Sequence, residues 1–278
     1  MIAVVAGAEA AEATSAIDVG WVEMLAAVSL IALAVAISLW RRLGLERSLI
    51  EASVRAGVQL LAVGLLFTFI FDAGGARLLA WAWVVIMVLI AMVVVYRRAP
   101  SIPGLWPAVL VAVGGSNAVA LGLVFGLGVF EHEPVTVVVI SGITIGNVLP
   151  AAVLAAQQLV RHFAEEQGQV EALLALGFNA RDATRFIGPR AARTALVGQI
   201  ERTRVVGLIA LPGAMTGLLL AGVDPIDAVL VQIIVMYLIL GAAAVAVTAI
   251  VWVGSRQAFT PDMRLADWTR DPERLAAD

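Results

Sequence analysis

Long uninterrupted runs of apolar residues constrain this fold more than any other feature of the sequence. A helix needs roughly 20 mostly apolar residues to cross the hydrocarbon core of a bilayer. The runs lack the apolar–polar alternation that would indicate membrane β-strands. Because 62% of the 278 residues are hydrophobic and only 14% are charged, a water-soluble enzyme or binding module is excluded. We expect an all-α integral membrane protein with about seven transmembrane helices, over residues 23–40, 56–71, 78–96, 107–130, 135–157, 205–223 and 228–253.

The placement of arginine predicts how these spans are oriented. All 18 basic residues are arginines, and short cytoplasmic loops accumulate positive charge. Seventeen of them follow the first, third, fifth or seventh predicted span and therefore lie on one side of the membrane. Only Arg77 lies on the opposite side. Acidic residues such as Glu131 and Asp224 lie on the side of Arg77. This pattern predicts an N-terminus outside and a C-terminus inside.

The longest segment between spans predicts a cytoplasmic helix-turn-helix between spans five and six. Residues 165–177 suit a helix outside the bilayer, which Gly177 is well placed to end. Asn179 suits the N-cap of a second helix, with Asp182 at the capping-box position. The alternative is an amphipathic helix on the membrane surface. We expect the first helix to present an apolar face to the cytoplasm, formed by Val170, Leu173, Leu174 and Gly177.

The spacing in this segment resembles the EAA signature of ABC-transporter permeases. Glu171-Ala172-Leu173 is followed after three residues by Gly177, and after nine more by Ile187 with Pro189 close behind. Leu173 and Gly188 depart from the signature. In those permeases the element docks into a groove on the ATP-hydrolysing subunit. The resemblance implies an ATPase-coupling segment, for which we select Glu171, Ala172, Leu174, Gly177, Asn179, Arg181 and Ile187.

A longer resemblance is to the FetB-type permease family. Arg55 to Leu60 with Gly64 is similar to the start of that family's second span, and Gly146-Asn147 is similar to a pair in its fifth span. The best match is 206–217, which continues through 221–225 to Gln232-Ile233. Bacterial members are assigned to iron export with a separate ATPase, and plant relatives are tied to aluminium tolerance.

The family resemblance implies a plan for the whole chain. It implies a multi-pass permease of the bacterial plasma membrane, with a cytoplasmic ABC ATPase and a second copy of itself as partners, and no nucleic acid. The chain itself would hold no cofactor, since ATP and Mg would bind the partner subunit. The predicted regions are an extracytoplasmic tail (1–22), a transmembrane permease domain (23–253) with the coupling segment 158–204, and a cytoplasmic tail (254–278) that we expect to be solvated.

Polar residues and a proline inside the predicted spans indicate where cargo would pass. Polar side chains are costly in hydrocarbon, and three on span five recur at a spacing that keeps them near one face. A proline inside a span removes a backbone hydrogen bond and favours a kink. The alternative is that the polar groups only bond to neighbouring helices. The predicted pathway residues are Gln59, Ser141, Thr144, Asn147, Pro212, Met215 and Thr216.

The sequence favours neither a tight metal site nor an enzyme. It has no cysteine, and its two histidines, His132 and His162, fall on opposite sides of the predicted bilayer. Without lysine it lacks the residue that a P-loop places on ATP phosphates, so ATP hydrolysis needs a separate subunit. We expect cargo such as iron or another metal to pass weakly bound or chelated, with export favoured over import. The alternatives are an ATPase-independent secondary transporter or channel, and a sensor or assembly factor.

Overall fold

The computed structural model describes residues 20–72, 75–98, 102, 104–260, 262 and 264–269. This part of the chain is helical apart from its loops and two isolated β-bridges. It divides into two compact units, each described here by itself. The first holds the chain up to Ala76 together with 216–228, and the second holds 77–215 and the residues from 229 onward. Of the predicted tails, residues 1–19 and 270–278 lie outside the described residues.

The first unit is built around a helical hairpin of α2 (Trp21–Arg41) and α3 (Glu46–Asp72). Arg42 and Gly44, with φ of 53° and 70°, adopt the left-handed conformation that ends one helix and turns the chain into the next. The buried hydroxyl of Ser38 accepts a hydrogen bond from the Leu45 amide at 3.2 Å and donates one to Glu46 Oε1 at 3.1 Å. Because α3 begins before the predicted second span, the charged residues ahead of residue 56 are helical and not in a loop.

The second unit contains four of the long apolar helices. They are α4 (Ala76–Arg98, of which Ala76 is counted with the first unit), the continuous stretch of α5 (Leu105–Val109), η1 (Leu110–Gly115) and α6 (Ser116–Gly126), then α7 (Pro134–Glu165), and α12 (Pro225–Gln257, which starts in the first unit). Together with α2 and α3, they make six helices in the described residues that are long and apolar enough to cross a membrane. All six fall on predicted spans, and this confirms the all-α membrane class.

The sixth predicted span, 205–223, is not a continuous helix. The backbone leaves the helix at Val206, Gly207 has φ of 85°, and Val206 forms an isolated bridge with Ala210. The helix that follows, α11 (Gly213–Leu220), starts only after Pro212. Its 8 residues reach about 12 Å, well short of the hydrocarbon core. Mean hydropathy predicted a span here because it takes no account of backbone breaks at glycine and proline.

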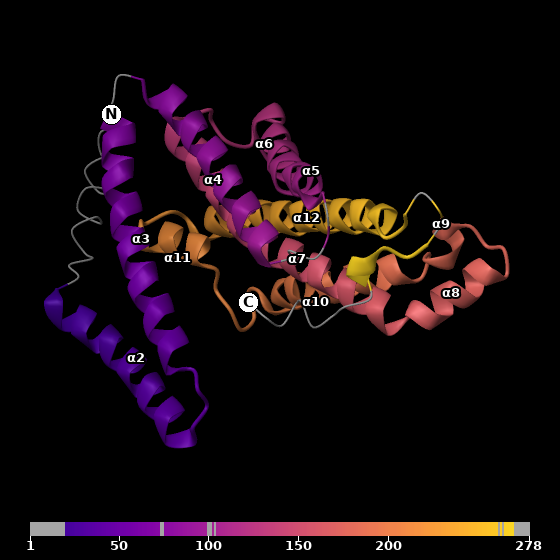
Figure 1. The fold of residues 1–278 in the computed structure, drawn as a ribbon. Helices are drawn as coiled ribbons and strands as arrows, with labels where there is room; N and C mark the ends of the chain where they lie inside the picture. Colours follow the sequence, from indigo (N-terminus) through magenta and orange to yellow (C-terminus); the bar gives the residue numbers. More distant parts are fainter. Residues whose placement is uncertain are drawn as a thin grey trace. The chain divides into compact units, whose positions relative to one another are not determined.

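The core of the second unit forms where α7 packs against α10 (Ile187–Val205) and α12 (Figure 1). Leu159 and Phe163 of α7 are fully buried in it, as is Ile250 of α12. The approach of α12 to α7 requires glycine at residue 254, because a Cβ there would overlap Leu159 Cδ2. This tight packing fixes the end of α7 from which the shorter helices extend.

The C-terminal residues that the structure describes pack on this unit, although we predicted a solvated tail. The indole N–H of Trp268, in the short helix η2 (Asp267–Thr269), donates to the Gln257 carbonyl at 3.2 Å. Ala258 and Leu265 are buried, and the Trp268 ring meets Phe163 edge-on at 5.8 Å. Apolar side chains among the charges therefore hold this part of the tail to the core.

Candidate functional site

The candidate site is the turn segment, residues 167–183, which consists of α8 (Gln167–Ala175), a tight turn and α9 (Ala180–Ala183). Gly177 has φ of 87°, and the Phe178 amide donates back to the Leu173 carbonyl at 3.1 Å, as at many helix ends. Asn179 Oδ1 accepts from the Asp182 amide at 2.9 Å, and Asn179 Nδ2 donates to Asp182 Oδ2 at 2.8 Å. The stop at Gly177 and the cap at Asn179 are therefore present as predicted.

The base of the turn segment is part of the core. This base consists of Val170 and Ala183 in the segment and Ile187 at the start of α10, which follows it. All three side chains are fully buried. Leu173 and Leu174 are partly buried and pack against the same core. The apolar face that we expected to point outward therefore points mostly inward, because periodicity identifies an apolar face without specifying what covers it.

The exposed tip of the turn segment consists of Leu176 and Phe178, on either side of Gly177. Their exposed fractions are 75% and 49%, high for large apolar side chains beside a well-packed base. The sequence prediction did not select either residue. The sequence feature that could have identified them is a pair of bulky apolar residues on either side of a glycine at a helix end, where solvent exposure is expected.

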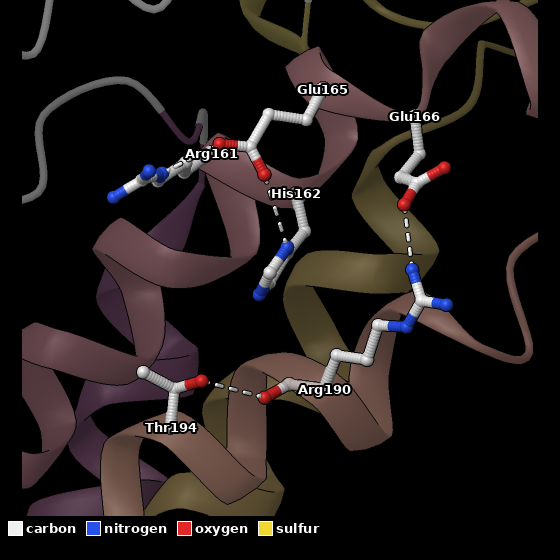
Figure 2. Close-up of polar contacts among 6 residues, drawn as sticks. All are labelled: Arg161, His162, Glu165, Glu166, Arg190 and Thr194. Atoms are coloured by element: carbon white, nitrogen blue, oxygen red, sulfur yellow. Dashed lines mark hydrogen bonds and ion pairs between the residues drawn. The ribbon is translucent and has the colours of Figure 1, made fainter.

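Ion pairs surround the base of the turn segment, and Figure 2 shows them. Arg190 Nη1 of α10 lies 2.6 Å from Glu166 Oε1, at the junction of α7 and α8. On α7, Arg161 Nε donates to Glu165 Oε1 at 2.7 Å, and His162 Nδ1 lies 3.5 Å from the other oxygen of Glu165. The Glu166–Arg190 pair joins residues 24 positions apart in sequence and so braces the base against α10.

The predicted coupling residues occupy three kinds of position. Ile187 is buried, so in this structure it packs in the core. Leu174 is partly buried, at the edge of the same core. Glu171 accepts a hydrogen bond from Gln167 Nε2 at 3.0 Å. The exposed members, which a docking protein could reach directly, are Glu171, Ala172, Gly177, Asn179 and Arg181.

The polar residues of α7 are mostly occupied by hydrogen bonds within the protein. The Thr144 hydroxyl donates to the Ile140 carbonyl at 2.8 Å, within the same helix. The hydroxyl of Ser141 is buried and accepts from Asn117 Nδ2 of α6 at 3.5 Å, while Asn117 Oδ1 is buried without a hydrogen-bond partner among the described residues. The structure therefore brings Asn117 and Ser141 together across two helices.

A hydrogen bond that the sequence did not indicate joins α10 to the middle of α7. The Asn147 side chain donates to the Ile143 carbonyl at 2.8 Å, and the Asn147 carbonyl accepts from Gln199 Nε2 at 2.8 Å. Gln199 is only 8% exposed. Nearby, Pro150 deprives the Gly146 carbonyl of its usual helical donor. No local pattern could have paired Gln199 with Asn147, because 52 residues separate them.

The remaining predicted pathway residues lie away from α7 in sequence. Gln59 is exposed on α3 in the first unit. Pro212 precedes α11, so the proline marks the start of a helix instead of a kink within one. Met215 and Thr216, in the first turn of α11, are both partly exposed. Among the described residues no group of three or more His, Asp or Glu side chains lies close enough to hold a metal ion.

The long apolar helices define a multi-pass, all-α membrane protein. The chain belongs to the family described as "Uncharacterised protein family (UPF0014)", which matches residues 21–259. A FetB permease is among the relatives described next, and this confirms the FetB-type resemblance that we drew from the sequence.

Three relatives illustrate the range of this family. "UPF0014 membrane protein STAR2" of Oryza sativa subsp. japonica is 35% identical over 227 residues, which cover 82% of this chain and 79% of the relative. "Protein ALUMINUM SENSITIVE 3" of Arabidopsis thaliana is 34% identical, over 81% of this chain and 82% of the relative. "Probable iron export permease protein FetB" of Escherichia coli (strain K12) is 29% identical, over 78% and 84%. No solved structure matches the chain.

Proposed function

We propose that this chain is the permease subunit of an ABC transporter and that a separate ATPase docks on residues 165–190. The observation that carries this proposal is the exposed apolar tip, Leu176 and Phe178, on a base buried in the core. A helix lying on the membrane surface would turn its apolar face to lipid. Here Val170 of that face is buried inside the protein, and Leu173 and Leu174 are partly buried against the same core. A small apolar tip on a rigid base suits insertion into a groove of a partner.

The positions of the arginines support a cytoplasmic location for the turn segment. Arg161, Arg181 and Arg190 lie in or beside it, and cytoplasmic loops are the ones that accumulate positive charge. Gly254 near the end of α12 packs on Leu159 near the end of α7, so both helices end on this side and we place the C-terminus inside. With the N-terminus outside, the broken segment 206–224 then carries the chain back across the membrane between α10 and α12. We propose the plasma membrane of a bacterium as the location, which the name of the Escherichia coli relative supports.

Force from the ATPase would reach the membrane through α7 and α10. In this mechanism the partner subunit binds ATP and Mg, and closure of two ATPase copies presses on the tips of a permease dimer. The Glu166–Arg190 pair joins the two helices at the base of the turn segment, and the Gln199–Asn147 hydrogen bond joins them in the middle of α7. α7 and α10 would therefore move as a rigid pair, the kind of element that switches a cavity between two faces of a membrane.

The cargo that we propose is iron or another metal, moved outward. The name of the Escherichia coli relative, a probable iron export permease, supports this cargo and direction. Asn117 and Ser141, which meet between α6 and α7, are neutral oxygen and nitrogen ligands. Such groups suit a hydrated or chelated ion held weakly, because hard cations prefer charged oxygen ligands for tight binding. Pathway roles for Asn147, Pro212, Met215 and Thr216 form part of the same proposal.

The test is recovery of the ATPase from membranes of the host. The tagged protein and an L176D/F178D variant are purified in mild detergent, and bound proteins are identified by mass spectrometry. Q169D serves as the control for added negative charge, because it places one carboxylate, against two in the double variant, at an exposed position of α8 outside the tip. We expect a Walker-motif ATPase with the wild type and with Q169D, and at least a tenfold loss with L176D/F178D. Recovery of the wild type without an ATPase would favour a secondary transporter.

A further inference from the structure

A pocket with a cavity volume of about 690 Å³ lies beside the turn segment, between the start of α10 and the last turns of α12. One wall carries Arg181 and Arg185, and the opposite wall carries Arg256. All of its lining residues belong to the second unit. Six of its lining residues fall within 165–190, the proposed docking segment, but none belongs to the tip or to the polar residues of α7, so docking at the tip does not account for the pocket.

The pocket is positively charged without compensation. Among the described residues that line it, none is acidic. The nearest acidic residue in sequence, Asp182, is exposed and already accepts a hydrogen bond from Asn179 Nδ2. By contrast, Arg161 and Arg190 at the base of the turn segment each form an ion pair with a glutamate. Three arginines facing one hollow with no acid in its wall favour an anionic ligand.

The other side of the pocket is apolar and belongs to a membrane helix. Val251 and Trp252 of α12 line it, and Trp252 is 55% exposed. The guanidinium carbon of Arg256 lies 3.9 Å from the centre of the Trp252 ring. Since α12 has 33 residues and is about 50 Å long, its last turns extend beyond a hydrocarbon core of roughly 30 Å. Tryptophan and arginine side by side at that level are typical of the membrane interface.

We propose that this pocket binds the headgroup of an anionic phospholipid from the leaflet at the arginine-rich side of the membrane. The phosphate is held by Arg185 and Arg256, and the first part of an acyl chain lies against Val251 and Trp252. A soluble anion would satisfy the arginines but would leave the apolar wall uncovered. Basic pockets between membrane helices are known to take such headgroups. A bound lipid would link the start of α10 to α12, close beside the turn segment.

The proposal is tested with the full chain, delipidated in detergent and titrated separately with phosphatidylglycerol, phosphatidylcholine and inorganic phosphate. Lipid binding is measured by native mass spectrometry. We expect phosphatidylglycerol to bind at least tenfold more tightly than phosphatidylcholine. The R185Q/R256Q variant should lose about 30-fold in phosphatidylglycerol affinity. Each of the two lost charges is expected to contribute what one basic residue contributes near an anionic membrane surface.

The control is R47Q/R202Q, which removes two exposed arginines outside the pocket and should change phosphatidylglycerol affinity less than twofold. Unfolding temperatures in phosphatidylcholine check that both variants fold. If R185Q/R256Q does not fold, R256Q alone carries the test, with an expected loss of about fivefold. Equal binding of the two lipids, or equal losses in variant and control, would overturn the proposal. The proposal would also be overturned if saturating inorganic phosphate abolished the preference for phosphatidylglycerol. A further contrary result would be an R185Q/R256Q variant that binds phosphatidylglycerol like the wild type and loses only ATPase recovery.

Discussion

Two of the segments that turn at a glycine with positive φ differ in what lies beneath the turn. In the turn segment, Gly177 with φ of 87° is flanked by exposed Leu176 and Phe178 over a buried base. In the segment 206–220, Gly207 with φ of 85° is followed by Leu208 and Ile209, which are 90% and 85% exposed. α11, which completes that segment, has no buried residue.

The difference separates two uses of exposed apolar surface. Where a few exposed apolar side chains rest on a packed base, a partner can meet a surface whose shape is already fixed. Where a whole segment is exposed, as over 207–211, the apolar side chains do not rest on a packed base and suit lipid or another membrane helix. The two segments therefore contribute differently to folding and to docking, and matched substitutions can separate these contributions.

The largest contrast is expected at the base of the turn segment. Ile187→Ala removes a fully buried side chain and should lower the free energy of unfolding by about 2–5 kcal/mol, from lost burial and the cavity that remains. Leu208→Ala, at a position 90% exposed, should change it by about 0.5 kcal/mol or less. The measurement is the unfolding equilibrium of the detergent-solubilised protein. Equal losses in the two variants would show that residues 206–211 are as well packed as the base.

A smaller, equal effect is expected at the two turn glycines. A Cβ at Gly177 or Gly207 would meet no atom within 4 Å, so Gly→Ala at either position costs only the strain of a left-handed backbone. That strain is about 1–2 kcal/mol. Both variants should lose this stability in thermal unfolding. ATPase recovery should fall with Gly177→Ala alone, because only that turn carries the proposed docking tip.

Local backbone chemistry made part of the turn segment predictable from sequence. Gly177 ends α8 and Asn179 caps α9 because each role depends on residues within a few positions. Five of the seven predicted spans are largely reproduced by helices because continuous apolar runs of that length have few other conformations available. The second predicted span lies within the longer helix α3, which starts among charged residues whose hydrophilic character excluded them from the predicted span.

The misses arise where distant parts of the chain decide the outcome. The inward direction of Val170 depends on the core formed by α7, α10 and α12, which periodicity alone cannot reveal. The Gln199–Asn147 bond joins residues 52 positions apart. The break at 206–212 follows from Gly207 and Pro212, whose effect on backbone conformation an average of hydropathy does not include. The exposure of Leu176 and Phe178 depends on which residues around them are buried.

The smallest effect is expected at the ion pair that braces the base. Glu166→Gln should cost about 0.5–1 kcal/mol of unfolding free energy, because its partner Arg190 is held at 2.6 Å but both side chains reach solvent. The matched control is Glu201→Gln, whose pair with Arg204 at 2.7 Å lies within α10, with exposed fractions of 56% and 68%. That variant should cost at most about 0.5 kcal/mol. A double-mutant cycle with Arg190→Gln isolates the coupling of the first pair. If this coupling is zero while ATPase recovery stays unchanged, the buried base alone fixes the turn segment, and the comparison between the two turns then depends entirely on burial.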